Sequence, residues 1–516
     1  MKNSHHLLVS LYLIAILLAV CSFAFPSCTN GSTTAEQQAP PNIIVILADD
    51  MGYGDIQAYN PDSKIPTPNL NQLVKEGMQF LDAHTGSAVC TPTRYGLVTG
   101  QYAWRTRLKK GVLSGYSSHL IDPDRATIAD VLKSQGYYTG VIGKWHLGID
   151  YPWVAGTPPQ EANDFGQFLP EPGDIDYSQA FKNSPNDIGF DYSYILPGSL
   201  DMSPYIYIQN DRATAIPDSI SPFIPFPAYQ RKGEIAPDFG HQDALDHFTI
   251  KAKEFITNRS KEKEPFFLYF PLTGPHKPAL PAQRFEGKSG LGPYGDLVMQ
   301  VDWTVGEVLN TLKEQGIADH TLVIYTSDNG SYMFRTPTDE PDHTMQEETQ
   351  GFHVANHQAN YIWRGTKADI FEAGHRVPFI VRWPGHVEAG ATAKPTICLT
   401  DILATTADIV GATVPANAAE DSYSFLPLLL QQETYQRLPV VHHAINGTFA
   451  LRKDQWKMVF SDGSGGREQP VGKVFEKPYQ LFDLEKDPSE TNNLIEVYPE
   501  IAAAMSSLLE EIKRED

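Results

Sequence analysis

Ile43-Ile44-Val45-Ile46-Leu47-Ala48-Asp49-Asp50 is the stretch that decides the fold, because an unbroken apolar run ends there in two carboxylates. Continuous apolar runs of this length predict strands covered on both faces, as in the parallel sheets of α/β proteins. Three further runs follow the same pattern of apolar strand and polar end. They are residues 139–142 before Lys144 and His146, residues 266–270 before His276, and residues 322–325 before Asp328 and Asn329.

Helical patterns separate these runs. Apolar residues recur at helical spacing in residues 68–76, 128–135 and 297–314. Strands that alternate with helices predict an α/β fold whose strands are joined by crossover connections. Because such sheets bind their ligands beyond the carboxyl ends of the strands, we expect the four polar clusters to gather in one place.

Two other regions differ in composition. Residues 151–238 are rich in Pro, Gly, Asp and Tyr and show little periodicity, which predicts long loops above the site. Beyond Pro415, a hairpin within residues 449–460, a strand at 480–482 and a helix at 499–513 indicate a smaller unit. The predicted division is a main domain over residues 42–415 and a C-terminal α+β subdomain over residues 416–516.

The N-terminus is typical of a targeting segment. Lys2 precedes an apolar run over residues 7–25, and Cys28 then precedes a polar stretch that reaches Pro41. This resembles a bacterial lipoprotein, with a signal peptide and lipid-acceptor cysteine over residues 1–28 and a flexible linker over residues 29–41. Cys21 is the alternative acceptor, and an uncleaved membrane anchor is the alternative interpretation. We expect export to the periplasm or outer membrane of a bacterium, with membrane attachment through the N-terminal lipid only.

The chain is strongly acidic, with a formal net charge of −22 from 40 Lys and Arg against 62 Asp and Glu. Nucleic-acid binding needs a basic face, so this balance argues against nucleic acid as a partner. An anionic small ligand would need a local cluster of positive groups.

Cys90-Thr91-Pro92-Thr93-Arg94 is the most informative segment. We expect Thr91 to cap a helix that begins at Pro92, which places Cys90 at the positive end of that helix. Arg94 would lie on the same side of the first turn and could reach an anion held there. The Cys90 thiol is either a nucleophile or a buried inert group, and the segment alone leaves both interpretations open.

Oxygen donors close two of the predicted strands. Asp49 and Asp50 follow the first apolar run, and Asp328 and Asn329 follow the last. Each pair alone is also typical of turn or capping chemistry. Together they predict a site for Ca²⁺, with Mg²⁺ as the alternative, because both cations prefer oxygen ligands.

Basic residues accompany these donors. Lys144 and His146 are two residues apart, so on an extended chain they project to the same face. His276 stands on a proline-rich loop, and Lys367 precedes the segment Glu372–Pro378. Each of these alone is typical of a solvated surface group. With Arg94 they form the positive cluster that an anionic ligand would need.

These motifs together resemble the formylglycine-dependent sulfatase family of the alkaline phosphatase superfamily, over nearly the whole mature chain. The matching segments are 48–55, 90–94, 143–148, 274–278, 327–330, 364–378 and 481–488. The resemblance implies a large mixed, mostly parallel sheet flanked by helices, with residues 42–415 as the catalytic domain. It also implies a maturation enzyme that converts Cys90 to formylglycine.

The resemblance implies a role for each site residue. One Ca²⁺ ion is held by Asp49, Asp50, Asp328, Asn329 and the modified Cys90. Arg94, Lys144 and Lys367 offset negative charge on the sulfuryl oxygens. His276 protonates the leaving alcohol, and His146 takes a proton from the formylglycine hydrate to release sulfate.

The substrate implied by the resemblance is a sulfated carbohydrate. Similarity in residues 198–211 favours 6-O-sulfated galactose or N-acetylgalactosamine. One alternative is a phosphonate or phosphodiester hydrolase of the same superfamily. A second alternative is a glycan-binding lipoprotein that keeps the fold without catalysis, although every matched catalytic position is filled here.

Overall fold

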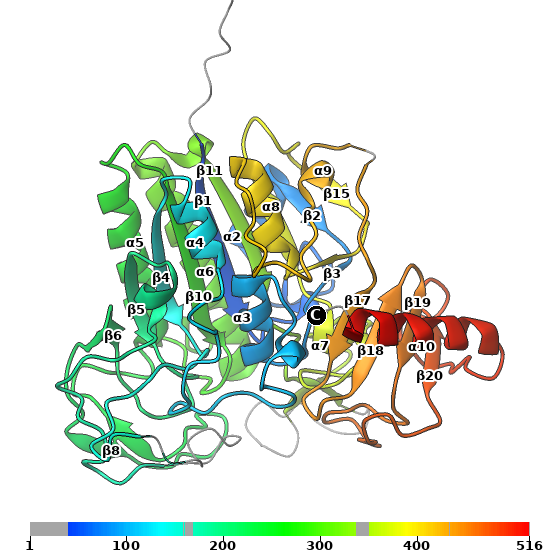
Figure 1. The fold of residues 1–516 in the computed structure, drawn as a ribbon, viewed down its shortest axis with the longest axis horizontal. Coiled ribbons are helices and arrows are strands. Elements are labelled where there is room, and N and C mark those ends of the chain that lie inside the picture. Colours follow the sequence, from blue (N-terminus) through cyan, green and yellow to red (C-terminus); the bar gives the residue numbers. More distant parts are fainter. Residues whose placement is uncertain (1–39, 158, 160–168, 337–349, 433, 515–516) are drawn as a thin grey trace, which may run out of the picture. The chain divides into compact units, whose positions relative to one another are not determined.

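A computed structural model describes residues 40–157, 159, 169–336, 350–432 and 434–514 (Figure 1). The predicted signal peptide over residues 1–28 and all but the last two residues of the predicted linker lie outside the described residues. Among the helices that the structure describes, none combines the length and the hydrophobicity needed to cross a membrane.

The core of the fold is a ten-stranded sheet with the order β15-β2-β14-β11-β1-β10-β4-β5-β6-β7. The four predicted apolar runs are its central neighbours and are parallel to one another. They are β11 (Thr321–Ser327), β1 (Asn42–Asp49), β10 (Phe266–Pro275) and β4 (Tyr138–Lys144). All eight residues of β1 are buried, as expected for a strand covered on both faces.

The outer strands make the sheet mixed, as the family resemblance implied. On one side, β14 runs antiparallel to both β11 and β2, and β15 pairs parallel to β2. On the other side, β5 continues the parallel part and β6 and β7 run antiparallel. Their bounds are β2 (Met78–Phe80), β14 (Phe379–Arg382), β15 (Ala391–Ala393), β5 (Tyr192–Leu196), β6 (Ile208–Gln209) and β7 (Arg212–Ala213).

The prediction that residues 151–238 are loops throughout is wrong. Three strands of the main sheet, β5 to β7, lie in this region, together with a separate hairpin of β8 (Ser219–Ser221) and β9 (Gly233–Ile235). These strands have two to five residues, which is too short for a periodic pattern, and pairing with β4 stabilises β5.

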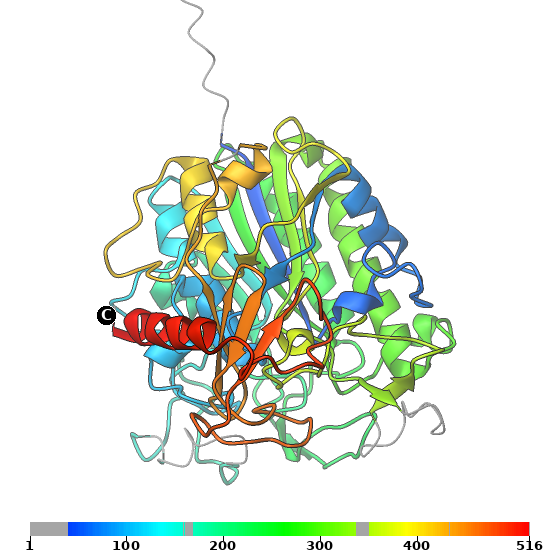
Figure 2. The same ribbon diagram turned by 90° about the vertical axis from the view of Figure 1, so that its right-hand side faces the viewer.

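Helices cover both faces of the sheet (Figures 1 and 2). Alternate residues of β1 divide between two apolar clusters: Ile43 and Val45 pack with α3, α4 and α8, and Ile44 packs with α2, α5 and α6. The bounds are α2 (Pro68–Glu76), α3 (Cys90–Thr99), α4 (Ile128–Lys133), α5 (Ala244–Arg259), α6 (Gly292–Glu314) and α8 (Asp401–Val410). The predicted helix at 68–76 is confirmed, α4 is two residues shorter than predicted, and α6 begins at Gly292 rather than residue 297.

The C-terminal part contains the predicted antiparallel strands and closing helix. A four-stranded sheet, β17-β18-β19-β20, packs its apolar face against α10. The bounds are β17 (Val440–His443), β18 (Phe449–Lys453), β19 (Trp456–Val459), β20 (Gln480–Asp483) and α10 (Pro499–Arg514). Before it, α9 (Leu426–Leu429) packs into the core of the large sheet through Leu429.

Short elements complete the described chain. Two-stranded ladders pair β3 (Ala83–His84) with β16 (Ile397–Cys398) and β12 (Phe334–Thr336) with β13 (Gly351–His353). The short helix α7 (Glu372–His375) connects the site region to β14. Single 3₁₀ turns lie at Tyr53–Asp55, Ala103–Arg105, Pro185–Ile188, Gln283–Phe285 and Ala318–His320.

Candidate active site

The polar clusters predicted at four strand ends meet at one edge of the sheet. Asp49 is the last residue of β1, Lys144 the last of β4, and His276 follows the end of β10. Asp328 and Asn329 follow β11 directly. Because these strands are adjacent and parallel, their carboxyl ends coincide, and Asp50 donates its backbone N–H to Asp328 Oδ1 at 3.1 Å.

Cys90 is the first residue of α3, which therefore begins two positions earlier than the predicted start at Pro92, and this makes the predicted Thr91 cap wrong. Val89 occupies the N-cap position and makes no side-chain cap hydrogen bond. Thr91 is buried, and its Oγ1 accepts a hydrogen bond from the backbone N–H of Leu113 at 3.2 Å. Cys90 nevertheless lies at the positive end of the helix, as predicted.

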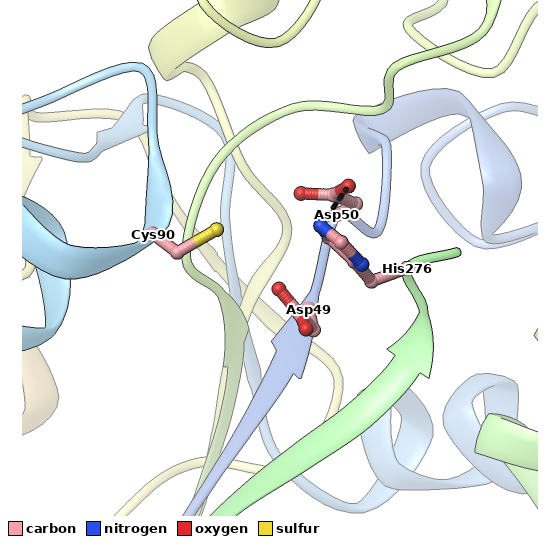
Figure 3. Close-up of side chains that lie close together, drawn as sticks. All are labelled: Asp49, Asp50, Cys90 and His276. Atoms are coloured by element: carbon pink, nitrogen blue, oxygen red, sulfur yellow. Dashed lines mark ion pairs between the residues drawn. The ribbon is translucent and has the colours of Figure 1, made fainter. Parts of the chain in front are cut away.

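The Cys90 side chain points toward the carboxylates (Figure 3). Ligand atoms of Asp49, Asp50, Cys90 and His276 all lie within 4.8 Å of one another. Burial raises the pKa of the Cys90 thiol to about 12, although Lys144 and Lys367 oppose that rise. The unmodified thiol is therefore neutral and a poor nucleophile here, since thiolate is the reactive form.

Three basic side chains pair with the three carboxylates of the cluster. Arg94 donates from Nη2 to Asp328 Oδ2 at 2.7 Å and lies 3.5 Å from Asp49 Oδ1. Lys144 Nζ lies 2.8 Å from Asp49 Oδ2. Lys367 Nζ, the only one of the three with exposed side-chain area (16%), lies 2.6 Å from Asp50 and 3.5 Å from Cys90 Sγ. The acidic chain thus contains the local positive cluster that the sequence predicted.

Burial and ion pairing shift the pKa values of Asp49 and Asp328 in opposite directions. Burial raises the pKa of Asp49 to about 7, although Lys144 and Arg94 lower it. Burial also acts to raise the pKa of Asp328, but Arg94, Lys144 and Lys367 together outweigh it, and the pKa is lowered. At Asp49, burial thus outweighs the two basic partners, Lys144 and Arg94.

The donor set fits a hard divalent cation. Asn329 donates from Nδ2 to Asp50 Oδ1 at 2.6 Å, while its own Oδ1 has no hydrogen-bond partner in the described part of the chain. A buried carbonyl oxygen without a partner costs free energy, and coordination to a cation would remove that cost. Since Asp49, Asp50 and Asp328 are already matched by basic groups, a divalent cation would leave the site positive.

Two buried histidines are electrostatically coupled to the basic groups of the cluster, and they contact backbone carbonyls through different ring nitrogens. His146 Nε2 donates to the Leu113 carbonyl at 2.8 Å, so its Nδ1, which has no partner among the described residues, is an acceptor. His276 donates from Nδ1 to the Lys277 carbonyl, and its Nε2 lies 3.7 Å from Asp50 Oδ2. Burial lowers the pKa of both rings well below the usual value, helped for both by Lys144 and Lys367.

Two site residues have unusual backbone conformations. Asp50 has a φ of +67° and His146 a φ of +55°. Non-glycine residues in this left-handed region are uncommon and are concentrated at functional sites, where the surrounding structure holds them. At Asp50, the backbone thus turns directly after β1, and its carboxylate contacts Asn329 and Lys367.

Family comparisons agree with this geometry. A family model described as "Sulfatase" matches residues 41–412, and a model for the C-terminal part of N-sulphoglucosamine sulphohydrolase matches residues 363–515. The chain belongs to the sulfatase family. It is a sulfuric ester hydrolase, and the fold and family predicted from the sequence are confirmed.

Relatives match this sulfatase over most of their length. An N-acetylgalactosamine-6-O-sulfatase of Bacteroides thetaiotaomicron is 35% identical over 99% of this chain and 100% of its own. Arylsulfatase A of Bos taurus is 32% identical over 90% of this chain and 85% of its own. A solved structure from work on glycosaminoglycan metabolism by Bacteroides thetaiotaomicron has a TM-score of 0.78 and 33% identity, covering 92% of this chain and 99% of that one.

Sulfatase membership implies a metal ion and a cysteine converted to formylglycine, and the buried Asp49, Asp50, Cys90 and His276 cluster is compatible with both. The structure brings every predicted site residue to this edge of the sheet. What the sequence missed is the Leu113 loop, which positions His146 through a backbone carbonyl. No side-chain motif signals such a contact.

Proposed function

We propose that this sulfatase removes the 6-O-sulfate from galactose or N-acetylgalactosamine in carbohydrates, with Cys90 acting as formylglycine. The observation that carries the proposal is the position of Cys90, at the start of α3, among buried carboxylates and the basic side chains that pair with them. The N-acetylgalactosamine-6-O-sulfatase that matches over the full chain supports the choice of sugar.

We assign the metal site to Asp49, Asp50, Asp328, Asn329 and the modified Cys90 side chain, and the ion to Ca²⁺. A bound Ca²⁺ would supply charge stabilisation for the sulfuryl oxygens. All four unmodified ligands offer oxygen atoms, and the orphaned Asn329 Oδ1 supports the assignment. Mg²⁺ remains the alternative, since it also prefers oxygen.

The basic side chains would bind the sulfate group. Lys367 approaches Cys90 Sγ at 3.5 Å and is a donor to any oxygen atom carried on that side chain. Burial acts to lower the pKa of Lys367, but Asp50 and the other acidic groups around it together outweigh burial, so the ammonium stays charged. Arg94 and Lys144 hold the carboxylates in place and add positive charge beneath the sulfate.

The two histidines would divide the proton transfers. The formylglycine hydrate supplies a nucleophilic hydroxyl and a second hydroxyl whose deprotonation releases sulfate. His146 suits the base role because its Nδ1 is a free acceptor. His276 would take the acid role on the leaving alcohol through Nε2, the nitrogen nearest Asp50, once the negative charge of the bound sulfate ester raises the pKa of the ring and protonates that nitrogen.

We also propose that the enzyme is an exported bacterial lipoprotein of the periplasm or outer membrane, held to the membrane through lipid on Cys28 or Cys21. Its implied partners are the sulfated sugar and a formylglycine-generating enzyme. The support is the apolar run over residues 7–25 followed by Cys28 and a polar stretch.

Mass spectrometry of the Cys90 peptide from a host with the maturation enzyme tests the nucleophile. We expect aldehyde in place of thiol, and Cys90→Ala should abolish turnover while the protein still folds. Fully active protein that contains only thiol would refute the mechanism. Defined sulfated sugars and an aryl phosphodiester, assayed side by side, separate the proposed activity from the phosphoester alternative.

A further inference from the structure

Buried polar atoms without partners also occur outside the carboxylate cluster, after β5. Ser199 Oγ, Asp201 Oδ1 and His241 Nε2 have no hydrogen-bond partner in the described part of the chain. An unpartnered buried polar atom costs free energy, so in native proteins such atoms bind water or a ligand. Three in one region point to a binding function.

Tyr205 and Arg231 join Asp201 and His241 into one group. The Tyr205 hydroxyl donates to the Arg231 carbonyl at 2.6 Å, and its ring lies against the His241 ring with centroids 4.4 Å apart. Arg231 Nη1 donates to Asp201 Oδ2 at 2.9 Å. The Asp201 side chain is 3% exposed and that of Arg231 31%, so a buried carboxylate with an unpartnered Oδ1 lies beside a partly accessible guanidinium.

On one side, this group adjoins the loop that positions His146. The backbone N–H of His146 donates to the Pro197 carbonyl at 3.1 Å, just before Ser199. Gly115, two residues after the Leu113 carbonyl that holds His146, packs against the same segment. A Cβ atom at Gly115 would lie 1.9 Å from the carbonyl oxygen of Ser203, so the two backbones are in direct contact.

On the other side, it adjoins the loop that carries His276. The backbone N–H of Ala279 donates to the Pro227 carbonyl at 3.0 Å. Lys277 lies over the ring of Tyr229, 4.5 Å from its centroid, two residues before Arg231. The Asp201–Arg231 pair therefore lies between the loops of the proposed base and the proposed acid, where the organic part of a sulfate ester would extend.

We propose that Asp201, Arg231 and His241 form a subsite that binds hydroxyl groups of the sugar ring bearing the sulfate. Asp201 Oδ1 would accept a hydrogen bond from one hydroxyl, and Arg231 would donate to a neighbouring hydroxyl oxygen. His241 Nε2 would form a hydrogen bond with a third polar group of the sugar. This inference rests on the proposed function, and it assigns sugar recognition to residues distinct from those that bind sulfate.

The test compares two substrates in the full chain with matured Cys90. Asp201→Asn should lower kcat/KM for 6-O-sulfated N-acetylgalactosamine about ten- to a hundredfold, mainly through KM, because it removes a charge-assisted hydrogen bond. Nitrophenyl sulfate has no sugar hydroxyls, so its hydrolysis should continue at nearly the unaltered rate. Arg231→Gln, at the more exposed member of the pair, should give the same selective loss.

Asp421→Asn is the matched control, since Asp421 also forms a buried pair with an arginine, Arg105, at 2.9 Å. It should affect both substrates alike. Equal losses on both substrates for Asp201→Asn and Arg231→Gln, or no loss on the sugar, would overturn the subsite. An unaltered enzyme that cleaves nitrophenyl sulfate but no sulfated sugar would overturn the proposed substrate, and the subsite with it.

Discussion

Three buried histidines predict that the enzyme loses stability as the pH falls below about 6.5, the pKa of an unperturbed imidazole. His84 of β3, His375 of α7 and His442 of β17 lie together, with the ring of His442 4.4 Å from that of His375 and 5.1 Å from that of His84. Burial lowers the pKa of all three, and well below the usual value for His375 and His442. The charged groups that face them are Asp82, Glu372, Arg376 and Lys457.

Acid lowers the free energy of unfolding because the unfolded chain takes up protons that the folded chain does not. Below about pH 6.5 the unfolded chain protonates these rings while the folded chain keeps them neutral, so acid favours unfolding. Each histidine then removes about 1.4 kcal/mol of the free energy of unfolding per pH unit. Between about pH 6.5 and about pH 5 the loss is about 2 kcal/mol for each of His375 and His442, whose pKa values lie well below the usual value, and His84 adds to it.

The assay is urea unfolding at about pH 7 and about pH 5, for the unaltered chain and for His442→Asn. The variant should lose about 2 kcal/mol less between the two pH values, whatever its stability at neutral pH. His386→Asn, which removes an exposed histidine, is the control and should leave the difference unchanged. If His442→Asn shows the same pH-dependent loss as the unaltered chain, the buried-neutral assignment is wrong.

The remaining predictions concern the site. His276→Ala should slow sugar sulfates about 10²–10⁴-fold and nitrophenyl sulfate much less, because only a sugar alkoxide needs a proton to leave; equal losses would transfer the acid role to Lys367. His146→Ala should bring both substrates to one slow rate after a burst, seen in rapid-mixing kinetics, and a steady rate without a burst would contradict the base role. Asp328→Ala should weaken Ca²⁺ binding in calorimetry and lower activity together. Chelation should abolish activity, with Ca²⁺ restoring it better than Zn²⁺, and a fully active metal-free enzyme would exclude the site.

The gathering of the site residues could be predicted without knowing the order of the strands, because it requires only that each residue follows a strand of the same parallel sheet. Asp49, Lys144, His276 and Asp328 each follow an apolar run, and in a parallel sheet the carboxyl ends of the strands share an edge. The cap of α3 could not be predicted in the same way. Thr91 is a good capping residue, but its hydroxyl instead accepts a hydrogen bond from Leu113, a contact that exists only in the folded protein.

The sequence by itself determined the α/β class, the central parallel strands, the family and the residue types of the site, because these depend on local periodicity and on motifs within a few residues. Only the tertiary structure decided the pairing of Arg94 with Asp328, the contact of Lys367 with Asp50 and the orientation of His146 on the Leu113 carbonyl. Residues 94 and 328 are 234 positions apart, and 50 and 367 are 317 apart. Such contacts form only after the strands have assembled, when burial makes each unpaired charge costly and so selects its partner.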